Sequence, residues 1–379
     1  MKTVRFLIFI VIFLFFLSIA VSATDVEKEV TDVISDELSG FKESLPSFVL
    51  DFLPDGLLEG DFSLLLSDEL NEKSFLNYAI DYLFASLGTV IKTFCSILIL
   101  ILLSSIFEML SSSLKNSSLS TVFIACSTLT VSLSVFNVCI SLCNYTTSYI
   151  NALCQAMNAF VPIMGAVQIM SGNLSSASLS NATMMLFISV TEVFLVAFML
   201  PLVKICMMLS CTKSLGGIEL GGFTRIIRNT LTTVTVFTMS IFMFVLSMKN
   251  VLTASIDSLS IKTARFAISS FVPLVGASVN DALRTVSSSL SFIKNSCGVI
   301  AIIIIALIIL PLIIYLFLNK VAFSLLSSIS IAIKCERQGD VLKEADSLCT
   351  YMLTLVACTS VLFIFALTIF IKTEMVLNG

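Results

Sequence analysis

The chain has 379 residues, of which 57% are hydrophobic and only 12% are charged, with a formal net charge of −4. This composition is typical of a protein that lies in a bilayer. The absence of histidine excludes Ser-His-Asp and Cys-His catalysis as well as imidazole metal sites, and the sequence has no Walker-type phosphate loop. We therefore expect no enzyme, no catalytic residue, no metal site and no cofactor. The eleven cysteines lie mostly in apolar segments, which favours small core residues over a disulfide framework.

The first 23 residues have the features of a secretory signal peptide. Lys2 and Arg5 precede an apolar run over 6–21, and Ala23 ends a stretch of small residues suited to cleavage. An uncleaved signal anchor is the alternative, and it would give the same topology. Residues 24–81 carry 15 acidic residues against three lysines, with apolar residues at helical spacing. We predict a translocated acidic region of short amphipathic helices, resting on the membrane domain or a partner, or simply solvated.

Residues 82–379 are predicted to form an all-α, polytopic membrane domain. Each of six apolar runs is long enough to cross a hydrocarbon core about 30 Å thick, which needs ~20 residues. The connections within pairs of spans carry lysines and arginines, which weakly favours a cytoplasmic location for them. The predicted spans are 83–107, 119–143, 182–210, 228–248, 297–318 and 349–371.

An internal repeat of about 110 residues underlies this domain. The segment 160–180 begins Phe-Val-Pro-x-x-Gly-Ala, and 271–291 begins in the same way. Pro162 with Gly165, and Pro273 with Gly276, predict a helix break or a re-entrant turn, because proline removes a donor and glycine allows close backbone approach. Such breaks could build a substrate site or serve as hinges between helix pairs.

The second span carries ten polar, uncharged residues that step alternately by three and four along one helical face. A seam of this spacing is normally apolar. It could hold helices together through hydrogen bonds, or it could line a water-filled path, for example one shared between copies of the chain. A continuous helix here would be about twice as long as the hydrocarbon core is thick, so it would have to project or bend near Pro162. We call these ten residues the polar seam: Ser127, Thr130, Ser134, Asn137, Ser141, Asn144, Ser148, Asn151, Gln155 and Asn158.

Glu192 lies near the middle of the third predicted span. An ionisable group at that depth is a functional candidate, as in a proton- or ion-coupled transporter. Lys204 is three helical turns further on, too far for a direct pair within the helix. A partner on another helix, such as Lys92, is therefore expected if the role of Glu192 is structural.

The sequence resembles the stage III sporulation protein AE family of endospore-forming bacteria. The resemblance combines a signal peptide and short acidic ectodomain with the stretch ARFAISSFVPLVG over 264–276, Asp281, Lys294-Asn295 and the Leu-Pro-Leu of 310–312. It extends over essentially the whole chain, and 264–320 is its most specific part.

The resemblance implies a subunit of the multiprotein stage III A complex. That complex is similar to a secretion-type channel across the mother-cell membrane, and it meets the forespore stage II Q protein. The implied role is in late forespore gene expression, with the other stage III A proteins as partners, the chain itself possibly as a homo-oligomer, and no nucleic acid. A secondary transporter, or permease, is the alternative function.

Overall fold

The structure is a computed structural model that describes residues 72–113, 117–170, 174–216, 226–227, 229–245, 247–248 and 276–372. These ranges are almost entirely helical and contain no β-strand, in agreement with the predicted all-α class. The predicted signal peptide, most of the acidic region and Pro273 lie outside them. The elements are α4 (Glu72–Ser113), α5 (Ser117–Met170), α6 (Leu174–Glu192), η4 (Val193–Met199), α7 (Leu200–Gly216), a helix over Asn229–Val245, α9 (Gly276–Ala332) and α10 (Glu336–Lys372).

Five of these helical stretches are long and apolar enough to cross a membrane, by length and composition. They correspond to five of the six predicted spans. The remaining predicted span, 228–248, corresponds to the shorter helix over Asn229–Val245, whose 17 residues extend over ~26 Å at 1.5 Å per residue. The five candidate spans are Ala79–Leu110, Val122–Ala166, Ser180–Thr212, Cys297–Ala332 and Glu336–Ile369.

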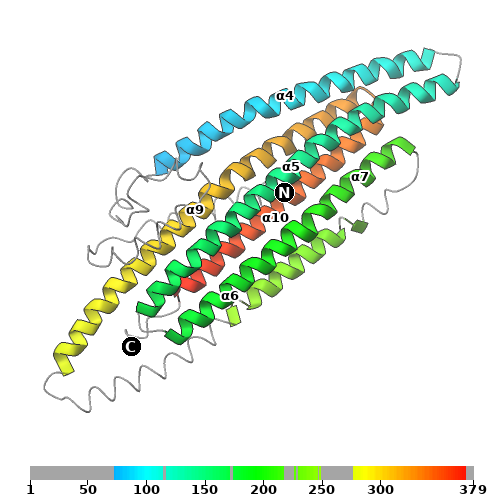
Figure 1. Ribbon diagram of the computed structural model, residues 1–379. Helices are drawn as coiled ribbons and strands as arrows, with labels where there is room; N and C mark the ends of the chain where they lie inside the picture. The colour runs from blue at the N-terminus through cyan, green and yellow to red at the C-terminus, as the bar shows by residue number, and fades with distance from the viewer. Residues whose placement is uncertain are drawn as a thin grey trace.

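The helix axes are nearly aligned in an elongated bundle, with α5 at its centre (Figure 1). α5 packs against α4, α6, α7, α9 and α10, whereas α4 packs on α5 and α9 at the edge of the bundle. α9 and α10 form the most extensive helix pair. The core is aliphatic and aromatic, with Phe323 and Phe363 among its largest fully buried side chains.

A tight turn joins α9 to α10. Lys334 adopts a left-handed conformation with φ of 67°, and its N–H bonds to Ile331 O while Cys335 N–H bonds to Ser330 O. These two bonds satisfy carbonyls at the end of α9, as in a Schellman motif. A Cβ on Gly339 would lie 2.8 Å from Ile331 Cγ1, so the glycine lets α10 return close to α9.

The prediction of a break at the first Phe-Val-Pro segment was wrong. α5 continues through Pro162 to Met170 as one helix of 54 residues, or ~80 Å, and therefore projects well beyond a single hydrocarbon core. Gly165 does allow close approach, because a Cβ there would overlap the side-chain amide of Asn181 on α6. In the second copy of the repeat, Gly276 is the first residue of α9.

Candidate functional site

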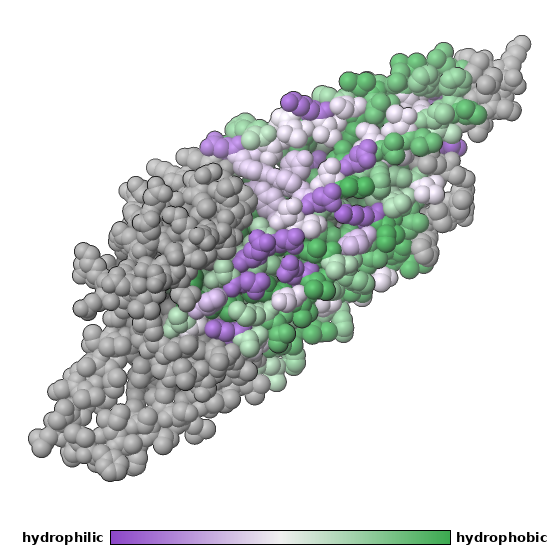
Figure 2. Space-filling model, in the orientation of Figure 1, coloured by the Kyte–Doolittle hydropathy of each residue, from purple (hydrophilic) through white to green (hydrophobic). Residues whose placement is uncertain are grey.

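The polar seam lies on the outside of the bundle. Its middle residues Asn137, Ser141, Asn144 and Ser148 are all exposed, and Ser127 at one end is buried. Figure 2 shows hydrophilic surface along the middle of this face, with hydrophobic surface on the side of α6 and α7. The seam therefore does not line a path within the described bundle, and most of it does not hold the helices of one chain together.

Hydroxyl groups of the seam are satisfied within their own helix. Thr130 Oγ1 donates to Cys126 O, Ser141 Oγ donates to Asn137 O at 3.0 Å, and Ser148 Oγ donates to Asn144 O at 3.2 Å. Such bonds to the preceding turn are usual for serine and threonine inside a helix. The asparagine amides are consequently the groups of the exposed seam with hydrogen-bonding capacity left over.

Lys204 meets the seam rather than Glu192. Its ammonium group on α7 donates to Asn144 Oδ1 at 2.9 Å, which ties α7 to α5. Asn151, three to four turns from Asn137, has a buried Oδ1 with no hydrogen-bond partner among the described residues. The seam thus contains one amide, that of Asn144, which is hydrogen-bonded to a charged group, and another, that of Asn151, whose acceptor oxygen has no partner among the described residues.

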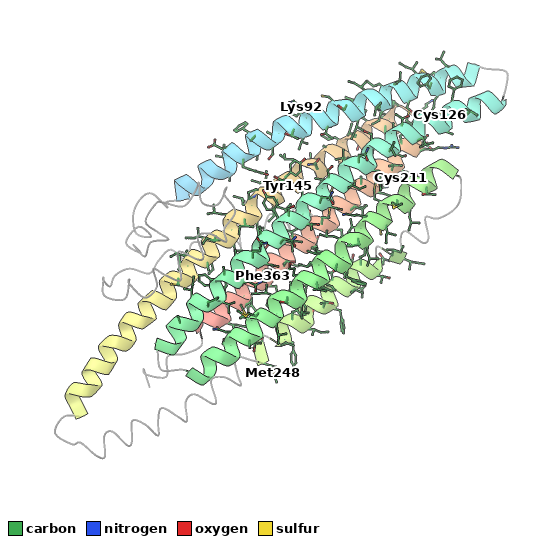
Figure 3. The ribbon with its side chains drawn as sticks, viewed as in Figure 1. Lys92, Cys126, Tyr145, Cys211, Met248 and Phe363 are labelled. Atoms are coloured by element: carbon green, nitrogen blue, oxygen red, sulfur yellow. The ribbon has the colours of Figure 1, made fainter. Side chains whose placement is uncertain are left out.

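Glu192 is half-buried at the junction of α6 and η4. The structure does not bring Lys92 to it, because Lys92 is exposed on α4 (Figure 3) and the two form no salt bridge. The Lys204 ammonium is bonded to Asn144 and forms no salt bridge with Glu192. The carboxylate does lie near enough to the buried Cys154 of α5 to interact with it electrostatically. The cation that a structural role would require is therefore absent among the described residues.

A π-helical segment, η4, follows Glu192 directly. Leu200 N–H bonds to Leu195 O, five residues back, and the next residue, Pro201, has no N–H to give to the usual acceptor. Insertions of this kind are rare and occur frequently at functional sites. The sequence signal for this interruption is Pro201 inside the third predicted span.

Hydrogen bonds to sulfur fix the end of η4 in the core. Tyr351 Oη of α10 donates to Met199 Sδ at 3.2 Å, and Thr235 Oγ1 lies 3.6 Å from the same sulfur. The Thr235 and Tyr351 hydroxyls are 2.7 Å apart. The π segment is thereby held between the helix over Asn229–Val245 and α10.

Four of the six tyrosines gather where α4, α5 and α9 meet. The Tyr82 and Tyr145 hydroxyls are 3.1 Å apart, and those of Tyr145 and Tyr149 are 3.4 Å apart. The Tyr145 and Tyr315 rings have centroids 5.2 Å apart, and Tyr145 is labelled at this place in Figure 3. We had not predicted this cluster, whose only sequence signal is the one-turn spacing of Tyr145 and Tyr149.

A buried polar junction joins α4, α5 and α10 near the end of the bundle. Gln338 is fully buried, and its Nε2 donates to Ser104 Oγ at 2.6 Å and lies 3.3 Å from Thr128 Oγ1 and 3.4 Å from Glu108 Oε1. Burial, reinforced by the charge of Glu108, raises the pKa of the nearby Cys335 thiol to about 11. No sequence pattern predicts this junction, because Ser104 and Thr128 lie in apolar runs and Gln338 lies among charged residues.

This junction also shows that α4 and α10 differ in polarity at one height of the bundle. Ser104 and Gln338 are in contact, yet Leu103 beside the first is exposed and apolar, whereas Arg337 and Asp340 beside the second are exposed and charged. Figure 2 shows hydrophobic surface over this end of α4 and α5. We call the exposed apolar residues there the tip surface: Ile99, Leu102, Leu103, Ile106, Met109 and Leu110 of α4, and Val122, Phe123, Leu129 and Leu133 of α5.

Comparison with protein families decides the identity of the chain. The family model for stage III sporulation protein AE matches residues 64–373, which is most of the chain. The chain belongs to this family. No curated protein and no solved structure matches it.

Membership in the stage III sporulation protein AE family makes this chain a sporulation-associated subunit of the stage III A complex. The matched range contains all five candidate spans, the polar seam, the Gln338 junction and η4, and it begins after the predicted signal peptide. Together with these spans, the family assignment establishes a membrane protein, and the family is not a known enzyme family. The described residues include no group of three or more cysteine or acidic side chains that could hold a metal ion.

Proposed function

We propose that this protein helps to build the wall of a passage through the stage III A complex that links mother cell and forespore. Its partners are the other stage III A proteins and, across the intervening space, the forespore stage II Q protein. It lies in the mother-cell membrane around the forespore and is required for late forespore gene expression. It is not an enzyme and takes no cofactor.

The observation that carries this proposal is the outward position of the polar seam. Asn137 and Asn144 are exposed on a helix that is part of a candidate span. A polar group facing hydrocarbon without partners is costly, so the seam needs water or another subunit against it. Uncharged amides and hydroxyls permit the passage of many solutes, because they present little fixed charge that would select ions, and the one cation bonded to the seam is Lys204 at Asn144.

A secondary transporter is the second candidate, and η4 is the observation that favours it. Glu192 adjoins this π segment, and interrupted helices beside an intramembrane carboxylate are a common feature of transport sites. The transporter requires Glu192 to titrate, whereas the passage does not. The two functions therefore make different demands on the same residue.

Thiol labelling of the seam tests the passage. Cys95 and Cys126 are the only exposed native cysteines, so a variant with serine at both provides a background of low reactivity. Single cysteines at Asn137 and Asn144 should then react with small membrane-impermeant reagents in cells that express the whole complex, and labelling should reduce late forespore gene expression. Cysteine in place of Leu186, which is 67% exposed on α6, is the matched control and should remain unreactive.

Two results would count against the passage. Unreactive thiols at both seam positions would show that no water reaches the seam. Labelling of both positions without any effect on forespore gene expression would show that the seam is wet but not part of a required path.

A further inference from the structure

The α5 face of the bundle has two properties that a protein partner explains and lipid does not. The first is the polar seam, in which the amides of Asn137 and Asn144 are exposed and, of these two, only Asn144 has a partner among the described residues, Lys204. The second is the tip surface, which continues the same face toward the end of α5. The polar seam and the tip surface consist of different residues, so they are two separate observations.

Lipid that covered the tip surface would also surround the charged side chains at the start of α10. Ser104 and Gln338 are in contact, so Leu103 on α4 and Arg337 on α10 lie at the same height in the bundle. Charged side chains inside the hydrocarbon core are expensive, and the start of α10 exposes Glu336, Asp340 and Lys343 as well, so this height of the bundle lies at or beyond the membrane surface. Where this end of the bundle extends beyond the bilayer, its exposed apolar residues mark a site of protein contact.

The spacing and the side chains of the seam indicate what kind of protein surface can pack on it. Its alternation of three and four residues is the spacing of a helix–helix seam, in which each side chain meets the equivalent level of a facing helix. An asparagine amide has both donors and an acceptor, so two identical amides can bond to each other. The seam side chains are uncharged, and the one cation bonded to them is the Lys204 ammonium at Asn144. Two copies can therefore approach at Asn137 without like-charge repulsion, whereas at Asn144 each copy also brings an ammonium group.

We propose that the partner on this face is a second copy of the chain, with α5 packed on α5 in parallel and in register. The proposal rests on the proposed function only in placing the seam at a subunit boundary. Two copies inserted with the same topology are parallel, and register then brings Asn137 to Asn137 and Asn144 to Asn144 of the second copy. Leu129 and Leu133 add apolar contact where the seam reaches the tip surface.

Cross-linking of full-length protein in membranes, expressed without other sporulation proteins, tests this pairing. Two copies with different tags are co-expressed in the background that lacks Cys95 and Cys126, each with one new cysteine, and are oxidised or treated with a short bifunctional thiol reagent. Cysteine at Asn137 or Asn144 should link the two tags at least about 5-fold more than cysteine at Leu186 or Phe84, a factor that corresponds to roughly 1 kcal/mol. Leu186 and Phe84 are both 67% exposed and lie off the seam.

A second variant guards against a cysteine that disturbs the seam. Asn137→Leu combined with Asn144→Leu should reduce co-purification of the two tags, because leucine offers no hydrogen bond and lipid gives no hydrophobic drive for helix association. Leu186→Ala should leave co-purification unchanged. Membrane levels of each variant are measured alongside.

Several outcomes would overturn the pairing. Equal linking on and off the seam would indicate random collision, and linking only to another stage III A protein would make that protein the occupant. Seam thiols that react with aqueous reagents but never link the two tags would show an open, hydrated face. Linking between tags together with a seam that is dispensable for forespore gene expression would sustain the pairing and refute the passage, so the two failures are distinguishable.

Discussion

Replacement of Gly165 by alanine should loosen the contact between α5 and α6. The added Cβ would overlap the amide of Asn181, whose Cγ would lie 2.8 Å away, and Asn181 is not exposed. Overpacking of this kind typically costs about 1–3 kcal/mol, since a packed neighbour must shift. Against this stands the gain of about 1 kcal/mol when a glycine inside a helix becomes alanine. The expected net change for Gly165→Ala is a loss of up to ~2 kcal/mol in the free energy of unfolding.

Gly88 provides the matched control. It also lies inside a helix, α4, but a Cβ there would meet nothing within 4 Å. Gly88→Ala should therefore show only the helix-propensity gain of about 1 kcal/mol. The two variants should differ by about 1–3 kcal/mol, although the chemical change is the same.

Thermal unfolding of the purified protein in detergent, followed by loss of helical circular dichroism or by protease resistance, measures the difference. Asn181→Ala combined with Gly165→Ala should restore most of the loss, because it removes the atoms that the new methyl group meets. Equal stability of the Gly165→Ala and Gly88→Ala variants would refute the reasoning. So would a double variant that is no better than Gly165→Ala and Asn181→Ala added together.

Three further outcomes follow from the described contacts. Glu192→Gln should leave membrane levels of the protein unchanged, because no described cation is bonded to this carboxylate, and loss of sporulation with normal levels would favour the transporter. Gln338→Leu should lower stability by about 1–3 kcal/mol, whereas Arg337→Ala on the exposed side should change it by less than about 0.5 kcal/mol, both by the same unfolding assay. Cys335 should resist maleimide at pH 7–8, since its raised pKa of about 11 keeps the thiol protonated until the pH approaches that value, while cysteine at Arg337 should label readily.

Hydropathy predicted the helices well because it is a property of each segment by itself. The predicted span 182–210 corresponds to the observed Ser180–Thr212, and the predicted start at residue 297 matches Cys297. The spacing of the polar seam likewise predicted that one face of α5 would be distinct. These features depend only on local sequence and helical geometry.

The heights at which helices pack against each other could not be predicted in this way. The apolar run around Leu103 and the charged run around Arg337 lie in different segments, and only the contact between Ser104 and Gln338 shows that they are level. The burial of Gln338 was hidden for the same reason, because its charged neighbours indicate a hydrated connection. Pro162 predicted a break that does not occur, since surrounding helices can maintain a helix through a proline within a membrane bundle.

The seam repeats every seven residues, whereas seven residues do not make a whole number of turns of a straight helix. This mismatch explains which seam residues are buried, and the burial pattern in turn locates the proposed contact. A straight helix drifts by ~20° per heptad against a strict seven-residue repeat, so from Ser127 to Asn158 the seam turns by roughly 90° around α5. Ser127 is accordingly buried at one end and Asn158 is half-buried at the other, whereas the seam residues Asn137, Ser141, Asn144 and Ser148 are exposed, as are Thr130 and Gln155 beyond them. Two straight helices could therefore meet only between Thr130 and Gln155, with the contact centred on Asn137 to Ser148, and a longer contact would need a left-handed supercoil of the pair. Cross-linking should accordingly be strongest between Asn137 and Ser148 and should decline toward both ends, and a maximum at either end would contradict the parallel α5 pairing.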